Sequence, residues 1–216
     1  MEEFVDVIER RVVALVDLAG FTAITELFGA ESALSMLDCF EAIVGRTVAP
    51  EGEVVKWIGD AAMILFDGPE AALSALGRLL PECRGEPRLP LTRTALAEGP
   101  VLRRRGDAFG AAVNLAARIG ALSRPGEALA TEPVALAAER QGLRVDRLGP
   151  VAIRSLAEPV PLFGLALAEA ADPSWIDPVC KMHAPASGFA RVEGAAPWFC
   201  SDACEAAWRR APEAYR

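Results

Sequence analysis

The sequence predicts an α+β fold: a sandwich with an antiparallel-rich sheet and helices on one face, followed by a small cysteine-containing module. Two observations lead to it. Strand-like and helix-like patterns alternate through most of the chain, and two of the strands are joined by a turn of only two residues. The composition then changes, because three of the four Trp, the only His and three of the five Cys follow residue 174. For 216 residues, one domain of about 150 residues with a small appendage is the natural expectation.

The first half of the chain supplies a strand, a long helix and a hairpin. Residues 11–17 form an apolar run that is typical of a buried strand, and residues 22–48 have helical periodicity with a break at Gly29. Residues 54–58 and 61–66 are expected to be two strands that meet at a tight Gly-Asp turn.

The next elements continue the alternation. Pro69 suits the first turn of a helix over residues 70–80, residues 91–96 are strand-like, and residues 109–122 have the pattern of an amphipathic helix. An acidic, Ala-rich stretch with a Pro then occupies residues 169–173, which indicates a linker. We therefore expect a domain over residues 1–168, a linker over 169–174 and a separate module over 175–216.

Composition excludes several classes of protein. The net charge of −8 opposes binding to nucleic acid, and no apolar run approaches the roughly 20 residues of a membrane span. We expect a cytoplasmic protein without a membrane anchor or secretory leader. A single His leaves little for histidine-based catalysis, and no Gly-rich phosphate loop is present. Any phosphate chemistry must therefore depend on carboxylates.

Two acidic residues follow strands in a way that suits a metal. Asp17 closes the first strand and Asp60 lies in the hairpin turn, so their carboxylates can converge on a hard cation such as Mg²⁺. The helix that begins near Thr22 would offer free N–H groups to phosphates. Taken singly, each Asp is more simply explained as a turn former or helix cap. The pairing is what favours the metal.

Four further residues are candidates for binding a substrate. Lys56 lies four residues before Asp60 in the hairpin, and Asp107 precedes the amphipathic helix. Asn114 and Arg118 share one face of that helix and could clamp a ribose and a triphosphate. The alternative is a solvated polar stripe with Asp107 as a cap, and Lys56 as an outward-facing strand residue.

Together the segments VDLAGFT (16–22), VKWIGDAAMILF (55–66) and GDAFGAAVNLAARI (106–119) resemble the class III nucleotidyl cyclase catalytic domain. The resemblance covers residues 10–168 and implies the ferredoxin-like sandwich of that family. It implies that Asp17 and Asp60, with the Leu18 carbonyl, bind two Mg²⁺ or Mn²⁺ ions per active site. It further implies that Lys56 and Asp107 read adenine, that Asn114 orients the ribose, and that Arg118 stabilises charge on the α-phosphate.

The activity implied by this resemblance is an adenylate cyclase, in which the 3′-hydroxyl of ATP attacks the α-phosphorus and pyrophosphate leaves. In the family the two halves of each site come from different subunits, so a chain with all six positions implies a homodimer. Guanylate cyclases carry a Glu and Cys type of pair where Lys56 and Asp107 stand. The segment 100–106 is shorter than in many members. Two alternatives therefore stay open: a catalytically weak nucleotide-binding module, and a metal-responsive dimeric scaffold.

The C-terminal segments DPVCKM (177–182) and FCSDAC (199–204) resemble the short YHS module and its TRASH relatives. Cys180, Cys200 and Cys204 have the spacing C-x19-C-x3-C, and with His183 as a possible fourth ligand they would suit Zn²⁺ or Cu⁺. Such a metal would also help so small a module to fold, and it could regulate the cyclase. The alternative is that these are small buried thiols, as we expect for Cys39.

Overall fold

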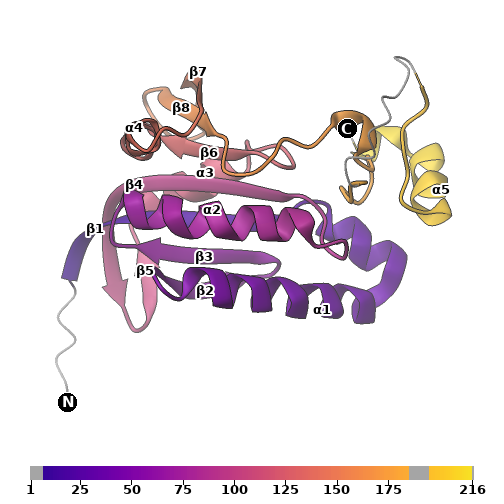
Figure 1. The fold of residues 1–216 in the computed structure, drawn as a ribbon, viewed down its shortest axis with the longest axis horizontal. Coiled ribbons are helices and arrows are strands. Elements are labelled where there is room, and N and C mark those ends of the chain that lie inside the picture. Colours follow the sequence, from indigo (N-terminus) through magenta and orange to yellow (C-terminus); the bar gives the residue numbers. More distant parts are fainter. Residues whose placement is uncertain (1–6, 185–194, 216) are drawn as a thin grey trace.

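The computed structural model describes residues 7–184 and 195–215, and these form one mixed sheet with helices on both faces (Figure 1). The strands are β1 (Val7–Leu18), β2 (Gly52–Ile58), β3 (Ala61–Phe66), β4 (Thr92–Arg104), β5 (Asp107–Phe109), β6 (Ala128–Thr131), β7 (Val145–Val151) and β8 (Val160–Leu165). The helices are α1 (Phe21–Val48), α2 (Pro69–Gly85), α3 (Ala111–Gly120), α4 (Glu132–Arg140) and α5 (Asp202–Arg210). The strand order is β2-β3-β1-β4-β6-β8-β7, with β5 paired to β4 outside this path.

The α+β class is confirmed, and most neighbouring strands are antiparallel as expected. Among the strand pairs of the described residues, only β4 and β6 run parallel. The expected break in the long helix is present, because Gly29 has a φ of 83° within α1. The hairpin strand β3 begins and ends where the pattern predicts.

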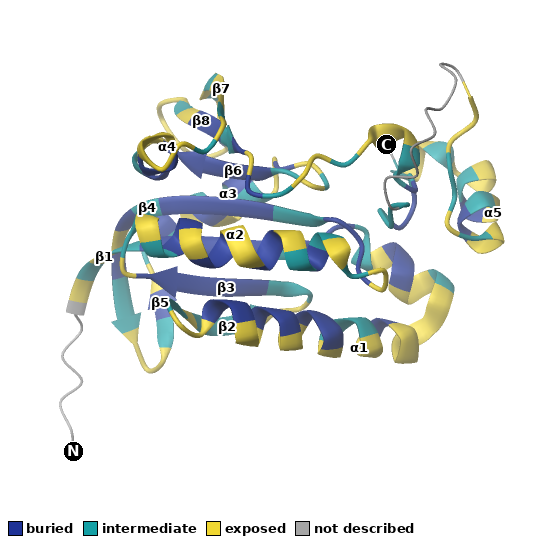
Figure 2. Ribbon diagram, in the orientation of Figure 1, coloured by how far each residue is buried: buried dark blue, intermediate teal, exposed yellow. Residues whose placement is uncertain are grey.

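The helices do not all lie on one face, so that part of the prediction is wrong. Helices α1, α2 and α4 pack on one side of the sheet around Phe40, Leu76 and Val134, all of them buried. Helix α3 packs on the other side, where Ala112, Ala116 and Ile119 meet Val13, Met63 and Ala95. Alternate residues of a strand point to opposite faces, so each central strand feeds both cores, as the buried central strands in Figure 2 show.

The ends of three elements also differ from the sequence prediction. The Gly99-Pro100 pair is typical of a strand end, yet β4 continues to Arg104 because it pairs with the full length of β1. Asp107 lies in the short strand β5 and not in a helix cap, so α3 begins at Ala111. The helix α2 likewise continues past Pro81, since Cys83 still packs into the core. Tertiary pairing and burial therefore outweigh the local stop signals.

The C-terminal residues pack against the first turns of α1. Val179, Cys180 and Cys204 form a buried cluster with Ala23 and Ile24 of that helix. In Figure 1, helix α5 lies at the end of the molecule where α1 begins. None of the helices in the described part of the chain combines the length and hydropathy needed to cross a lipid bilayer.

Candidate active site and thiol cluster

The two strand-end carboxylates lie next to each other. Asp17 is the penultimate residue of β1 and Asp60 lies in the β2–β3 turn, and the amide N–H of Leu18 donates to the Asp60 carbonyl at 3.4 Å. Burial and the adjacent Asp17 carboxylate raise the pKa of Asp60 to about 6. Two carboxylates in that position repel each other, and a divalent cation would relieve the repulsion. The oxygen donors present therefore fit Mg²⁺ or Mn²⁺.

Arg93 is a member of this site that the sequence analysis missed. It is the cross-strand partner of Asp17 in the β1–β4 pair, and its Nη2 lies 2.5 Å from Asp17 Oδ2. The antiparallel register that opposes the two residues depends on the whole length of β4, which the local pattern did not give. Arg93 therefore holds the Asp17 carboxylate in place beside Asp60.

Lys56 and Asp107 form the pair that the resemblance implies. The Lys56 Nζ donates to Asp107 Oδ2 at 2.8 Å, and the backbone N–H of Ala108 donates to Oδ1 at 2.7 Å. The Lys56 hydrogen bond is the main reason that the pKa of Asp107 is lowered. A shift in the β2–β3 register at Val54/Lys56 accompanies this arrangement. The pair thus presents a cationic donor and an anionic acceptor side by side.

Asn114 and Arg118 lie on α3 one turn apart, with Asn114 exposed and Arg118 half-buried. Within residues 7–184 and 195–215, neither side chain takes part in a hydrogen bond or an ion pair. No such contact joins them to Asp17 or Asp60. The structure therefore brings together two groups of candidate residues, the carboxylates and the Lys–Asp pair, and leaves the α3 residues open.

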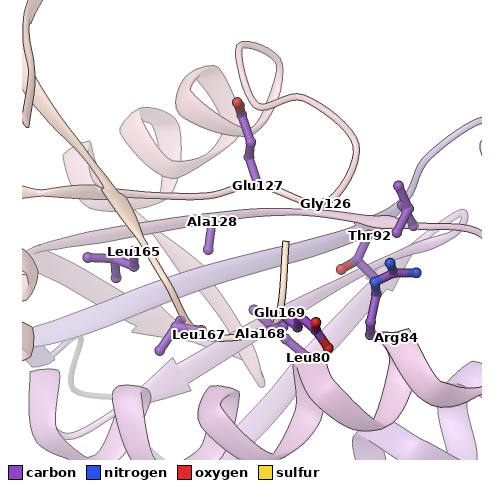
Figure 3. A pocket seen from close by; sticks show the side chains of 11 residues that line it. Leu80, Arg84, Thr92, Gly126, Glu127, Ala128, Leu165, Leu167, Ala168 and Glu169 are labelled. Atoms are coloured by element: carbon purple, nitrogen blue, oxygen red, sulfur yellow. The ribbon is translucent and has the colours of Figure 1, made fainter. Parts of the chain in front are cut away.

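The face of the sheet that carries α3 is only partly covered. Leu15, Val55, Val113 and Leu115 pack at the edge of the α3 core and remain partly exposed, while Ile58 and Phe109 are about half exposed. Two hollows of the described chain do not contain the candidate residues. The first measures about 30 Å³ and is lined by Arg84, Thr92 and Glu169 among others (Figure 3), which is far too small for a nucleotide. The second lies by Arg11 and Arg103. Neither of these two hollows in the described residues is therefore a nucleotide pocket around the candidate residues.

The three cysteines of the C-terminal region come together. Cys180 Sγ lies 3.4 Å from Cys200 Sγ, and Cys200 Sγ lies 3.7 Å from Cys204 Sγ. We call these three residues the thiol cluster. With Asp177 they form a group whose possible ligand atoms lie within 4.8 Å of one another, so the group could hold a metal ion. Soft thiolate donors in this number suit Zn²⁺ or Cu⁺.

Asp177 is a second residue that the sequence analysis missed. Its carboxylate is fully buried and accepts the backbone N–H groups of Val179 (2.8 Å), Cys180 (3.3 Å) and Cys200 (2.8 Å). These bonds tie the two cysteine-bearing segments to each other. The signal available in the sequence was its position, an Asp three residues before the first Cys. Asp177 therefore shapes the thiol cluster whether or not it is itself a ligand.

His183 is not brought to the thiol cluster, although the sequence analysis named it as a possible fourth ligand. Residue 183 forms an isolated β-bridge with Ile176, and its ring lies by Arg84 of α2 with both ring nitrogens buried and unpaired among the described residues. Burial lowers its pKa, and the Arg84 charge adds to this. The backbone bridge directs the ring towards α2, so Asp177 and not His183 accompanies the three thiols.

Comparison with known proteins bears on the domain that carries the first site. No family model matches the chain. A "pH-sensitive adenylate cyclase MT1302" from Mycobacterium tuberculosis (strain CDC 1551 / Oshkosh) is 32% identical over 155 residues, which is 70% of this chain and 39% of the relative. An "Adenylate cyclase" from Streptomyces griseus is 33% identical over 123 residues, which is 56% of this chain and 30% of that protein. The chain thus spans well under half the length of these curated relatives.

Solved structures share the fold at low sequence identity. An adenylate cyclase from Trypanosoma brucei superimposes with a TM-score of 0.69 and 17% identity, covering 75% of this chain and 90% of that one. The adenylyl cyclase CyaB from P. aeruginosa gives 0.65 and 18%, covering 76% and 96%. A guanylate cyclase domain from Catenaria anguillulae gives 0.62 and 17%, covering 74% and 98%. The strands and helices that hold Asp17, Lys56 and Asn114 therefore have the fold of adenylate and guanylate cyclase catalytic domains.

Proposed function

We propose that this chain is an adenylate cyclase that converts ATP to 3′,5′-cyclic AMP and pyrophosphate. The observation that carries the proposal is the pairing of Asp17 with Asp60 at one sheet edge together with the Lys56–Asp107 ion pair at 2.8 Å. A nonenzymatic scaffold needs neither group. The named adenylate cyclases that are about a third identical to this chain support the same assignment.

The Lys56–Asp107 pair supports ATP over GTP as the substrate. Adenine presents an acceptor at its ring nitrogen and a donor at its exocyclic amine, which match the Lys56 ammonium and the Asp107 carboxylate. Guanine presents the opposite pattern there, so the Lys56 ammonium would face a donor and the Asp107 carboxylate would face an acceptor. The shared fold does not decide this point, because the structural neighbours include both adenylate and guanylate cyclases.

In the reaction, the ribose 3′-oxygen forms a bond to the α-phosphorus and the bond to the β-phosphate oxygen breaks. Asp17, Asp60 and the Leu18 carbonyl would hold two Mg²⁺ or Mn²⁺ ions, which lower the pKa of the 3′-hydroxyl and neutralise the leaving pyrophosphate when bound. Asn114 would position the ribose, and the Arg118 guanidinium would stabilise the charge on the α-phosphate. Asn114 is exposed and Arg118 is half-buried, and neither side chain is engaged in a hydrogen bond or ion pair within the described residues.

We further propose that the site is completed by a second copy of the chain. Asn114 and Arg118 make no hydrogen bond or ion pair to the carboxylates within the described residues, and the face that carries α3 is half open and partly apolar. A two-fold dimer across that face would place each α3 over the partner's carboxylates. Each dimer would then hold two sites.

The test is cyclic nucleotide formation by the purified chain from ATP, with GTP as the control, in Mg²⁺ and in Mn²⁺. Cyclic AMP from ATP alone is the expected result. Mixing inactive Asp60→Ala and Asn114→Ala chains should restore up to about a quarter of the activity of the unmodified dimer, since one intact site forms in each mixed dimer. No recovery from mixed dimers that are shown to form would overturn the shared-site arrangement.

A second candidate is a metal-responsive protein in which the cyclase fold chiefly supplies a dimeric scaffold. The thiol cluster is the observation that favours it, because the described residues of the C-terminal region converge on a site for a soft cation. Cation binding to that region could equally regulate a working cyclase, and its resemblance to the YHS module fits either role. Metal binding without nucleotide turnover would select the scaffold.

A further inference from the structure

The C-terminal region contacts the loop that directly follows Asp17, the proposed metal ligand at the end of β1. The backbone N–H of Leu91 donates to the carbonyl of Lys181 at 3.1 Å, and the N–H of Ala19 donates to the carbonyl of Leu91 at 2.8 Å. Ala19 lies two residues after Asp17. A relay of two backbone hydrogen bonds therefore connects Lys181 to the segment that holds the catalytic carboxylate.

The same loop also lies in close contact with Cys180. Gly20 has a φ of +79°, and a Cβ built on it would lie 2.6 Å from the Cys180 carbonyl oxygen. Only glycine leaves room for two backbones at this separation. Val179 and Cys180 further pack on Ala23 and Ile24 in the first turn of α1. The C-terminal region therefore packs against both the loop between β1 and α1 and the first turn of α1.

The side chain of Lys181 anchors the segment that makes this contact. The Lys181 Nζ donates to the carbonyls of Pro178 (2.5 Å) and Tyr215 (3.3 Å). Both acceptors belong to the C-terminal region, so the backbone relay is what connects residue 181 to the end of β1 that carries Asp17.

Cys180 belongs both to this contact and to the thiol cluster. Its Sγ lies 3.4 Å from Cys200 Sγ, while its carbonyl lies against Gly20. A cation bound by the three thiols would join Cys180 to Cys200 and Cys204. Among the described residues, no β-sheet hydrogen bonding joins these two segments. A small module with a small apolar core gains much of its order from such a cation. Loss of the cation would loosen Cys180, Lys181 and the relay beyond them.

We propose that the Cys180–Lys181 segment is a positioning element for Asp17, and that a thiophilic cation in the thiol cluster keeps this element in place. Its catalytic consequence rests on the proposed function. A filled thiol cluster orders the Asp17 loop and strengthens Mg²⁺ binding at Asp17 and Asp60. Because coupling between two binding sites is reciprocal, Mg²⁺ strengthens cation binding by the thiols to the same degree.

The direct test is hydrogen exchange of the Ala19 and Leu91 amides in the full chain, measured by NMR with and without one equivalent of Zn²⁺. Zn²⁺ should slow exchange at both amides by about tenfold. Cys200→Ala should remove this response, and Cys83→Ala is the matched control because Cys83 lies in the cyclase core away from the thiol cluster. Equal exchange with and without Zn²⁺ in a chain that binds Zn²⁺ would overturn the proposal.

A second measurement separates this proposal from the proposed function. The Mg²⁺ concentration that gives half-maximal cyclic AMP formation should fall by about tenfold on Zn²⁺ loading, in the unmodified chain and in Cys83→Ala but not in Cys200→Ala. If no form makes cyclic AMP while the two amides respond to Zn²⁺, the cyclase assignment fails and the positioning element is supported. If cyclic AMP forms with the same Mg²⁺ requirement throughout, the positioning element fails and the cyclase assignment stands.

Discussion

The two candidate metal sites of this protein are built in opposite ways. The carboxylate site offers hard oxygen donors at the end of β1 and in the β2–β3 turn, beside a large core on both faces of the sheet. The thiol cluster offers soft donors at the edge of a small core, with Cys180 and Cys204 buried, Cys200 exposed and the buried Asp177 joining the two cysteine-bearing segments. In our proposal the first site is completed by a second copy of the chain. All the proposed donors of the second come from one chain.

The largest expected effect follows from removing one oxygen donor. Asp17→Ala should lower metal-dependent cyclic AMP formation by about a thousandfold, because the remaining Asp60 cannot hold the cations alone. The fold should be unchanged, since the side chain lies at the end of β1. Activity assays alongside circular dichroism check this. Asp38→Ala, which removes an exposed carboxylate of α1, is the control, and comparable activity in Asp17→Ala would refute the metal assignment.

The proposed role of the Lys56–Asp107 pair can be tested by changing the preference for ATP or GTP. The double variant Lys56→Glu with Asp107→Cys should shift the ratio of kcat/KM for ATP and GTP by about a hundredfold towards GTP, because the hydrogen-bonding pattern facing the base is inverted. Product analysis of reactions with each nucleotide measures the ratio. The single variant Lys56→Glu serves for comparison: it places two carboxylates together and should lose activity with both nucleotides. An unchanged preference in an active double variant would contradict the assigned base contact.

Replacing Asp177 is expected to weaken metal binding by the thiol cluster and to leave metal binding by Asp17 and Asp60 unchanged. Asp177→Asn replaces one acceptor oxygen by an N–H donor that faces backbone N–H groups, so Zn²⁺ affinity should fall by about ten- to a hundredfold. Competition with a chromophoric chelator measures the affinity. Asp172→Asn is the matched control, because Asp172 also accepts a backbone N–H (from Ser174, 2.9 Å) but is exposed. Equal losses in both variants would show that Asp177 has no special role.

The smallest expected effect concerns the contact of Gly20 with Cys180 of the C-terminal region, for which Gly29 is the control. Gly29→Ala should cost about 1 kcal/mol of unfolding free energy, because its φ of +83° strains an L-residue but nothing lies within 4 Å of the new Cβ. Gly20→Ala has a similar φ and should cost at least about 2 kcal/mol, because the Cβ would also overlap the Cys180 carbonyl. Denaturant unfolding of both variants gives the difference. Equal losses of unfolding free energy in the two variants would mean that the C-terminal region does not contact Gly20 in solution.

The α+β class, the β2–β3 hairpin and the division of the candidate residues into a carboxylate site and a thiol cluster could be predicted from the sequence. Those features are local: alternation sets strands, a Gly-Asp pair sets the turn, and the spacing of the cysteines survives in the folded cluster. Asp17 and Asp60 could be paired in advance, because a hairpin turn and the end of the strand beside it lie at the same sheet edge.

The partners of these residues follow from the packing of whole elements and could not be predicted from the sequence. Arg93 faces Asp17 through a register set by a twelve-residue ladder, and Asp177 replaces His183 beside the thiols because backbone N–H groups from two distant segments converge on its carboxylate. The contact of Cys180 with Gly20 joins residues 160 positions apart, since 180 − 20 = 160. Such contacts depend on how whole elements pack, and sequence periodicity describes only the face that each element buries.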